Sequence, residues 1–509
     1  MTRAEGVFRD TAAGVGKTTW TFAIGLATVP VLVAKLGMAG YGTYASLQLL
    51  GVTGLLGSAD LGIQNGIARF IGAYQGDERP DRTRRLVRAG FLYFAVVAVV
   101  ISAALVLSSK SIALHFLRAP LESRSEYQFA VVAVAVGFLF QFPGLVLRAY
   151  FVGSGRLARL RGWEAVERTV GAMTAMAMAI SGFGIAAIVM AEQAVLFVAL
   201  VAMAASAAAS DRGSFVGPGG PPADTKSVIA LGSTVFASKL GYIALQMLPD
   251  VLVAAILGPA AIAAYTVAKK MPLALKTLQS SLNSAVFAMA VQSDEGNSIA
   301  TAHRAVRAAR LLLLLVTPVC VMCAALSERL LVAWAGPAFA PFAWLATGLL
   351  LAHLPHAFTL AGVSGLTELE QLRRGLPYSI VPAVALVIGL PWILSSYGLF
   401  PLPLVLFAAG ACQAVGVAAS ISVGLDGASR LLWHSLIAPV LLGAAATAVP
   451  AFLAHWLVGP SVISLIAWSL LSGSIGLAGT LLLGLSAQER SRLLGSVSRR
   501  FHLQTRVIP

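Results

Sequence analysis

The chain has 509 residues, of which 58% are hydrophobic and only 11% are charged, and its formal net charge is +15. Soluble domains contain about 25% charged residues, so this composition leaves too little polar surface to cover a water-soluble fold and argues against a large soluble enzyme. It predicts an all-α membrane protein with many spans. Because the basic residues cluster in short gaps between apolar runs, the positive charge indicates membrane topology, and we expect no nucleic-acid partner.

A membrane-spanning helix needs about 20 mostly apolar residues, and about 14 segments of the chain meet this requirement. In chain order they cover residues 15–37, 44–72, 89–109, 127–150, 163–182, 184–209, 229–257, 262–290, 309–326, 339–360, 376–396, 402–424, 432–456 and 461–485. No clear cleavage site follows the first segment, so we expect it to be a retained helix and not a signal peptide.

Residues 14–19 read Gly-Val-Gly-Lys-Thr-Thr, which is similar to a nucleotide phosphate-binding loop. That loop requires a further glycine at position 11 and a solvated helix after it, but position 11 is Thr11 and an apolar span follows. We therefore interpret Lys17 as a positive anchor at the cytoplasmic end of the first span, with Trp20 as an interfacial aromatic residue. Alternatively, Lys17 meets a phosphate of a transported molecule at this helix end.

The distribution of Lys and Arg predicts the orientation. If the amino terminus is cytoplasmic, 24 of the 36 Lys and Arg residues fall in inside segments, and only Lys110, Arg118, Arg124 and Arg329 fall in outside loops. Because cytoplasmic loops carry an excess of Lys and Arg, we expect both termini in the cytoplasm and an even number of spans.

The two halves of the chain resemble each other at three matching places. Residues 31–44 resemble residues 251–265, 84–89 resemble 303–308, and 159–162 resemble 372–375. Six predicted helices separate the copies, and an even number makes the repeats parallel. Two such bundles can rock about a central site and open it to one side at a time, which is typical of an alternating-access transporter.

The repeat also predicts the domain organisation, which is two pseudo-symmetric six-helix bundles followed by two C-terminal helices. A Gly/Pro-rich stretch between the bundles is a linker by composition. The expected boundaries are 1–212 for the first bundle, 213–227 for the cytoplasmic linker, 228–425 for the second bundle, 426–485 for the two extra helices and 486–509 for a basic cytoplasmic tail.

Residues 34–74 resemble the first hairpin of bacterial polysaccharide flippases of the O-antigen type. These belong to the multidrug/oligosaccharidyl-lipid/polysaccharide (MOP) transporter superfamily, whose polysaccharide branch commonly has 14 spans. The resemblance implies that the chain moves an undecaprenyl-pyrophosphate-linked oligosaccharide across the bacterial cytoplasmic (inner) membrane for cell-surface polysaccharide, such as lipopolysaccharide or exopolysaccharide. The matching positions are Leu36, Gly37, Tyr41, Gly42, Tyr44, Gly62, Ile63, Gly66, Ile67 and Arg69.

Ionisable side chains inside predicted spans cost about 2.5–3.5 kcal/mol each on insertion scales, so they are candidate functional residues. Basic side chains suit an anionic cargo, because Lys and Arg donate charge-assisted hydrogen bonds to phosphate oxygens. The predicted substrate-binding cations are Lys239, Lys276, Lys269, Lys270, Arg148, Arg69 and Lys35. The candidate ion-coupling carboxylates are Asp60, Asp250 and Glu192.

Structural alternatives exist for several of these groups. Lys35 and Arg69 lie near helix ends and can extend to the interface, and one of Lys269 and Lys270 can face lipid headgroups. Glu192 could serve only an interface of small residues between helices.

Two further clusters have simpler interpretations. The spacing of Glu164, Glu167 and Arg168 at the start of the fifth helix favours a cytoplasmic salt-bridge cluster over a site. His353 and His356, one turn apart, could sense pH, but a polar contact between packed helices is favoured.

Three other functions remain as alternatives. An exporter of cationic drugs would have a site dominated by carboxylates, whereas the membrane ionisables here are mainly basic. A membrane-bound polysaccharide polymerase or ligase would usually carry a large outward loop, and a structural scaffold would not need the repeat. We expect no catalytic residues, metal or cofactor. The expected partners are the lipid-linked anionic glycan, membrane lipids and the glycan polymerase or glycosyltransferase machinery, and we expect a monomer.

Overall fold

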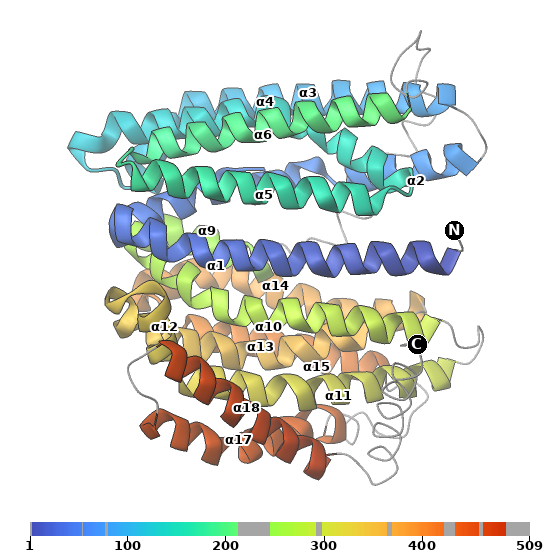
Figure 1. Ribbon diagram of the computed structural model, residues 1–509, viewed down its shortest axis with the longest axis vertical. Coiled ribbons are helices and arrows are strands. Elements are labelled where there is room, and N and C mark those ends of the chain that lie inside the picture. Colours follow the sequence, from blue (N-terminus) through green and yellow to red (C-terminus); the bar gives the residue numbers. More distant parts are fainter. Residues whose placement is uncertain are drawn as a thin grey trace, which may run out of the picture. The chain divides into compact units, whose positions relative to one another are not determined.

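The fold is all-α in every part of the chain that the structure describes. The structure, a computed structural model, describes residues 3–52, 54–76, 80–211, 245–291, 298–363, 369–421, 433–457 and 462–484. These residues form helices joined by turns (Figure 1), as the apolar composition predicts. The chain divides into two compact units, the first made of residues 1–267 and 383–401 and the second of residues 268–382 and 402–509.

Several helices are long and apolar enough to cross a membrane. Within the described ranges there are seven, or eight if the bent pair 309–325 and 327–335 forms one span. The chain is thus a multi-pass membrane protein. The total of about 14 spans stays a prediction, because the linker 213–227, the tail 486–509 and most of segment 229–257 lie outside the described residues.

The first unit is a bundle in which α4 lies between α3 and α6, while α5 packs against both α6 and α1 (Figure 1). Its helices are α1 (Arg3–Leu50), α2 (Ile63–Gly76), α3 (Pro80–Ser111), α4 (Arg124–Gly153), α5 (Leu157–Ile180), α6 (Ile185–Ser210) and α9 (Leu248–Leu257), with short turns at Leu55–Asp60, Ile112–Phe116 and Leu121–Ser123.

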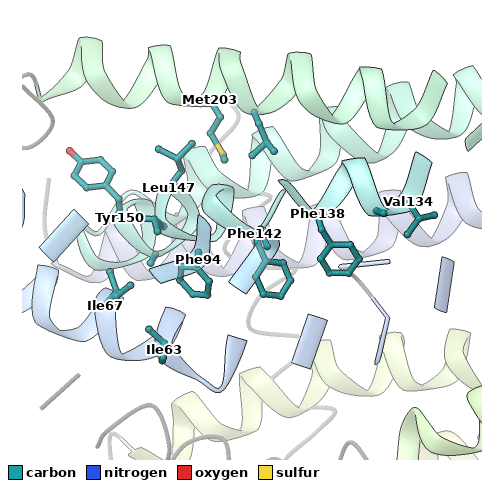
Figure 2. Close-up of a cluster of buried hydrophobic side chains, with 14 of the residues drawn as sticks. Ile63, Ile67, Phe94, Val134, Phe138, Phe142, Leu147, Tyr150 and Met203 are labelled. Carbon is teal, nitrogen blue, oxygen red and sulfur yellow. The ribbon is translucent and has the colours of Figure 1, made fainter. Parts of the chain in front are cut away.

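The core of this bundle is built from aromatic side chains of α3 and α4. Figure 2 shows Phe94, Phe138 and Phe142 gathered there, all fully buried. The ring centroids of Phe94 and Phe142 lie 5.9 Å apart in an edge-to-face arrangement, and those of Phe138 and Phe142 lie 5.3 Å apart. Since lipid is as apolar as these side chains, such close packing and not the hydrophobic effect holds the helices together.

The second predicted span, residues 44–72, is interrupted and is not one helix. α1 ends at Leu50, a 3-10 turn follows at Leu55–Asp60, and α2 begins at Ile63. A Cβ atom at Gly54 would lie 2.1 Å from the Leu49 carbonyl oxygen, so the tight turn admits only glycine there. Irregular backbone at membrane depth occurs where it is buried in protein or lines a water-filled cavity, so this break points to a site.

Two glycines in α1 explain the motif that resembles the flippases. Gly37 has a φ of 71° and ψ of 174°, which interrupts the helix where the first predicted span ends. Gly42 lets α1 approach the chain after α9, because a Cβ atom there would lie 1.8 Å from the carbonyl oxygen of Pro259. On the facing loop, the guanidinium of Arg118 donates to the carbonyls of Ile256 and Leu257 and thereby caps the carboxyl end of α9.

The second unit is organised around α11, which packs against α13, α17 and α18, while α13 also packs against α15. Its helices are α11 (Ser298–Ala325), α12 (Ser327–Ala335), α13 (Ala343–Val363), α15 (Leu402–Ile421), α17 (Ala438–Leu457) and α18 (Val462–Gly484), with short turns at Pro337–Phe342 and Trp433–Ile437. Two helices, α10 (Pro259–Val291) and α14 (Leu369–Tyr397), contribute residues to both units.

Replacing Gly42 by alanine tests the close approach of α1 to Pro259. We expect Gly42→Ala to lower the thermal unfolding midpoint of the purified protein, because the added methyl group has no space, at a cost of about 1–3 kcal/mol. Gly171→Ala in α5 is the matched control, since nothing lies within 4 Å of its Cβ position. Equal midpoints for both variants would contradict the close approach.

Candidate functional site

The first unit contains a polar cavity of about 290 Å³. It lies among α1, α4, α5, α6 and the interrupted segment before and within α2. Its polar lining consists of Lys17, Gln64, Gln141, Arg148, Glu164, Glu167 and Arg168. Val52 and Gln64 come from either side of the helix break, so the irregular backbone does border a polar cavity.

Local sequence explains how the charged side chains converge. Glu164 and Glu167 are three residues apart on α5 and therefore share one helix face. That face is turned toward α4, which carries Arg148, and toward α1, which carries Lys17. One turn after Lys17, Trp20 donates its indole N–H to the hydroxyl of Thr169 on α5 at 2.8 Å, so two polar contacts join α1 to α5.

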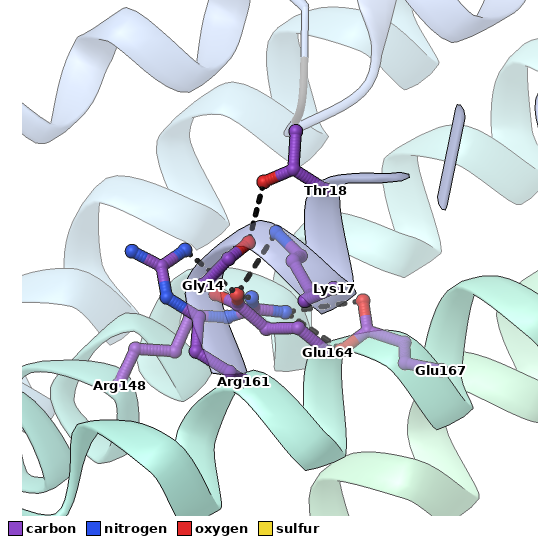
Figure 3. Close-up of polar contacts among 7 residues, drawn as sticks. All are labelled: Gly14, Lys17, Thr18, Arg148, Arg161, Glu164 and Glu167. Atoms are coloured by element: carbon purple, nitrogen blue, oxygen red, sulfur yellow. Dashed lines mark hydrogen bonds and ion pairs between the residues drawn. The ribbon is translucent and has the colours of Figure 1, made fainter. Parts of the chain in front are cut away.

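The charged groups form one connected network (Figure 3). Glu164 accepts from Lys17 at 3.0 Å and from Arg148 at 3.1 Å, and Arg161 lies 3.4 Å from the same carboxylate. Arg148 also reaches Glu167 at 2.8 Å and so bridges both carboxylates. The predicted cluster of Glu164, Glu167 and Arg168 is thus found in part: the two carboxylates pair with Lys17, Arg148 and Arg161, whereas Arg168 lines the same cavity.

The cavity wall carries more positive than negative charge. Lys17, Arg148 and Arg168 line it together with only Glu164 and Glu167, which leaves an excess of one positive charge. A partly buried ion pair contributes little net stability, because desolvation offsets the attraction. The ion pairs therefore position Lys17 and Arg148 at the cavity wall, but they are weak enough for each cation to exchange its carboxylate for another anion.

A second polar group lies in α6, the helix that also lines the cavity. The predicted ion-coupling residue Glu192 is buried and accepts hydrogen bonds from the Tyr44 hydroxyl at 2.6 Å and the Gln48 amide at 2.9 Å. The charge of Arg168 reaches it electrostatically. Both hydrogen-bond donors are uncharged, so this carboxylate is not part of the salt-bridge network.

The other two candidate carboxylates lie at helix ends. Asp60 stands at the break before α2, where it accepts from the Gly62 backbone N–H at 3.0 Å. Asp250 is in the first turn of α9 and is hydrogen bonded to the Tyr265 hydroxyl. Pro249 occupies the first turn of α9, a helix position where proline is tolerated.

The remaining predicted cations are not gathered around the cavity. Lys35 and Arg69 belong to the first unit and are exposed. Lys269, Lys270 and Lys276 lie on α10 in the second unit and are partly buried. Lys239 lies outside the described residues.

The sequence interpretation missed the cavity itself. Gln64 and Gln141 are neutral, and Glu164 and Lys17 lie 147 positions apart, so no local pattern links them. The available signal was the glycine-rich run before Asp60, since a break in a spanning helix indicates a lined cavity.

Comparison with known proteins identifies the family. A family model described as "Polysaccharide biosynthesis protein" matches residues 36–343, which is more than half of the chain. No curated protein sequence matches the chain.

Solved structures share the fold at low identity. The lipid II flippase MurJ in an inward closed conformation is 11% identical, with a TM-score of 0.69, 92% of this chain covered and 96% of that one. A MOP superfamily transporter from Pyrococcus furiosus is 14% identical, with a TM-score of 0.54 and coverages of 84% and 96%. An inward-facing multidrug resistance MATE family transporter is 12% identical, with a TM-score of 0.51 and coverages of 83% and 95%.

The family model and the shared fold agree with the resemblance of residues 34–74 to the flippase hairpin. The chain therefore belongs to the family of polysaccharide biosynthesis proteins, and its fold is similar to that of MOP superfamily transporters.

Proposed function

We propose that this transporter flips a lipid-linked, undecaprenyl-pyrophosphate type oligosaccharide across the bacterial cytoplasmic membrane by alternating access. The observation that carries the proposal is the pair of cations, Lys17 and Arg148, held at the wall of a polar cavity by two carboxylates. The proposal includes cytoplasmic termini, as the bias of Lys and Arg supports, and a role in cell-surface polysaccharide synthesis, as the family suggests.

Partner exchange explains how such a site accepts an anion. Phosphate oxygens and carboxylate oxygens both accept charge-assisted hydrogen bonds from Lys and Arg. An entering pyrophosphate can therefore replace Glu164 and Glu167 as the partner of Arg148 without leaving its guanidinium unpaired. Hydrogen bonds to the pyrophosphate replace hydrogen bonds to the two carboxylates, so the net free energy of binding stays small. The substrate can therefore be both bound and released, as a transport cycle requires.

The cavity dimensions fit a headgroup and not a whole glycan. Binding pockets for drug-sized molecules measure about 300–1,000 Å³, and this cavity of about 290 Å³ lies just below that range. It is large enough for the pyrophosphate linkage. The oligosaccharide would extend elsewhere, so the cavity would recognise what all lipid-linked substrates share.

A cation exporter is the second candidate, since similarly folded multidrug transporters exist. Glu164 and Glu167 could attract a cation. However, Lys17, Arg148 and Arg161 already neutralise both carboxylates. A cationic drug would have to displace three fixed positive charges, so the charge balance favours the anionic substrate.

Neutralising the two cavity cations tests the proposal. We expect Lys17→Gln and Arg148→Gln each to lower the rate of glycan export by about tenfold or more, because each removes charge-assisted bonds worth about 1.5–3 kcal/mol. Export is measured as cell-surface glycan in a strain that depends on this transporter. Arg85→Gln is the matched control, since Arg85 bonds the Asp81 carbonyl on its own helix and does not line the cavity. Normal export by both cavity variants would overturn the assignment.

Glu192 is the candidate coupling group with the clearest geometry. If Glu192 carries a coupling proton, Glu192→Gln should make residual transport independent of the proton gradient, because a side-chain amide does not take up a proton near neutral pH. Transport is followed in vesicles before and after the gradient is dissipated. The exposed Glu122→Gln provides the control. Continued dependence on the gradient in Glu192→Gln would remove this role from Glu192.

A further inference from the structure

A second cavity of the first unit lies at the turn between α4 and α5. It measures about 360 Å³ and is lined by Gly155, Arg156, Ala158 and Arg159. It shares no lining residue with the cavity that holds Lys17 and Arg148. The candidate span that contains α4 ends at Gly153, so this turn comes directly after a membrane-spanning helix. Lipid headgroups occupy the same level, just outside the hydrocarbon core.

Backbone hydrogen bonds fix the shape of this turn. Gly155 has a φ of 68°, and its N–H donates to the Val152 carbonyl at 3.1 Å. The N–H of Arg156 donates to the Phe151 carbonyl at 2.9 Å, which completes the Schellman motif that ends many helices. α5 begins one residue later, at Leu157. The end of α4 therefore holds Arg156 at the start of α5, independently of any bond that its side chain makes.

Arginine is an unusual residue at the position before a helix. The side chains preferred there accept hydrogen bonds from the first N–H groups of the helix, whereas a guanidinium only donates. The Arg156 side chain makes no capping hydrogen bond, and the first turn of α5 contains no acidic residue. The amino end of a helix itself carries partial positive charge. Together with Arg156 and Arg159 it makes the cavity strongly positive.

The Arg156 guanidinium forms no ion pair with the residues that the structure describes. Its Nη1 atom is buried and has no hydrogen-bond partner among them. Its charge reaches the Tyr150 hydroxyl, but that hydroxyl is already bonded to the Asp211 carboxylate at 3.0 Å. A buried donor without a partner is costly. The cavity thus lacks an acceptor, which an anion would supply.

An apolar strip continues from the cavity along α5. It consists of Val166, Val170 and Met173, which are all exposed. Val166 lies seven residues after the exposed Arg159, and Val170 and Met173 follow at spacings of four and three, so all four share one helix face. A ligand whose charged end fills the cavity can therefore lay an apolar chain on this α5 strip.

From this arrangement we infer that the cavity binds the phosphate of an anionic phospholipid of the membrane, with one acyl chain on the α5 strip. The phosphate oxygens accept charge-assisted hydrogen bonds from Arg156 and Arg159. The N–H groups at the start of α5 favour an anion at the same place. A free phosphate offers the same oxygens but leaves the α5 strip uncovered, so the strip decides in favour of the lipid. This site does not depend on whether the chain flips glycans.

Photocrosslinking in the purified full-length transporter tests the site. The probe is phosphatidylglycerol with a photoactivatable diazirine in one acyl chain, present at a low mole fraction in phosphatidylcholine nanodiscs. Crosslinked peptides are mapped by mass spectrometry. We expect label on the α5 strip, because the two arginines hold the headgroup at the start of α5. Phosphatidylcholine with the same diazirine carries no net charge and should label the strip several-fold less at an equal mole fraction.

Two double variants assign the label to the cavity. Arg156→Gln combined with Arg159→Gln should lower labelling of the α5 strip by phosphatidylglycerol about tenfold, because charge-assisted hydrogen bonds are lost. Arg85→Gln combined with Arg88→Gln removes the same charge from α3, outside this cavity, and should leave the labelling unchanged.

Inorganic phosphate provides the arm that separates a free anion from a lipid. A large molar excess of it should not displace the phosphatidylglycerol probe, since it cannot cover the α5 strip. Three results would overturn the lipid site: equal labelling by the two lipid probes, equal labelling of the wild type and the cavity variant, or complete displacement by inorganic phosphate. The last result would assign the cavity to a free anion.

Discussion

The structure depends on one constraint, which is that a charged or polar group inside a membrane must find a partner or face water. Arg148 meets it with two carboxylates, Glu192 meets it with a tyrosine and a glutamine, and Gln279 joins two helices by satisfying both ends of its amide. Each solution ties together helices that are distant in sequence. The polar groups therefore specify which helices pack together, while the aromatic core supplies the close contact.

The same constraint explains what could be predicted from the sequence. Composition and the length of apolar runs were sufficient for the all-α membrane class, and the hairpin motif was sufficient for the family. The motif now has a physical basis, since Gly42 permits close approach to Pro259 and Tyr44 bonds Glu192. The interruption before α2 was not predicted, because hydropathy averages over residues 44–72 and cannot register a turn inside an apolar run.

The candidate site was only partly predictable for a related reason. Ionisable residues in apolar segments can be found by inspection, and Arg148 and Glu192 were found that way. Their partners cannot, because a salt bridge such as Lys17 to Glu164 joins positions far apart in the chain. The sequence pattern assigned Glu164 and Glu167 to a local cluster on one helix. Packing of α1 and α4 against that helix turned it into the wall of a cavity.

The two units satisfy their internal polar groups by different contacts. In the first unit, cations and carboxylates neutralise each other around the cavity, so an anion must compete with groups already in place. In the second unit, the Gln279 amide bonds the His353 ring and the Ala357 carbonyl, so neutral hydrogen bonds join α10 to α13. The cavity of the first unit is therefore where an anion would meet cations, whereas the contact between α10 and α13 is held by uncharged groups.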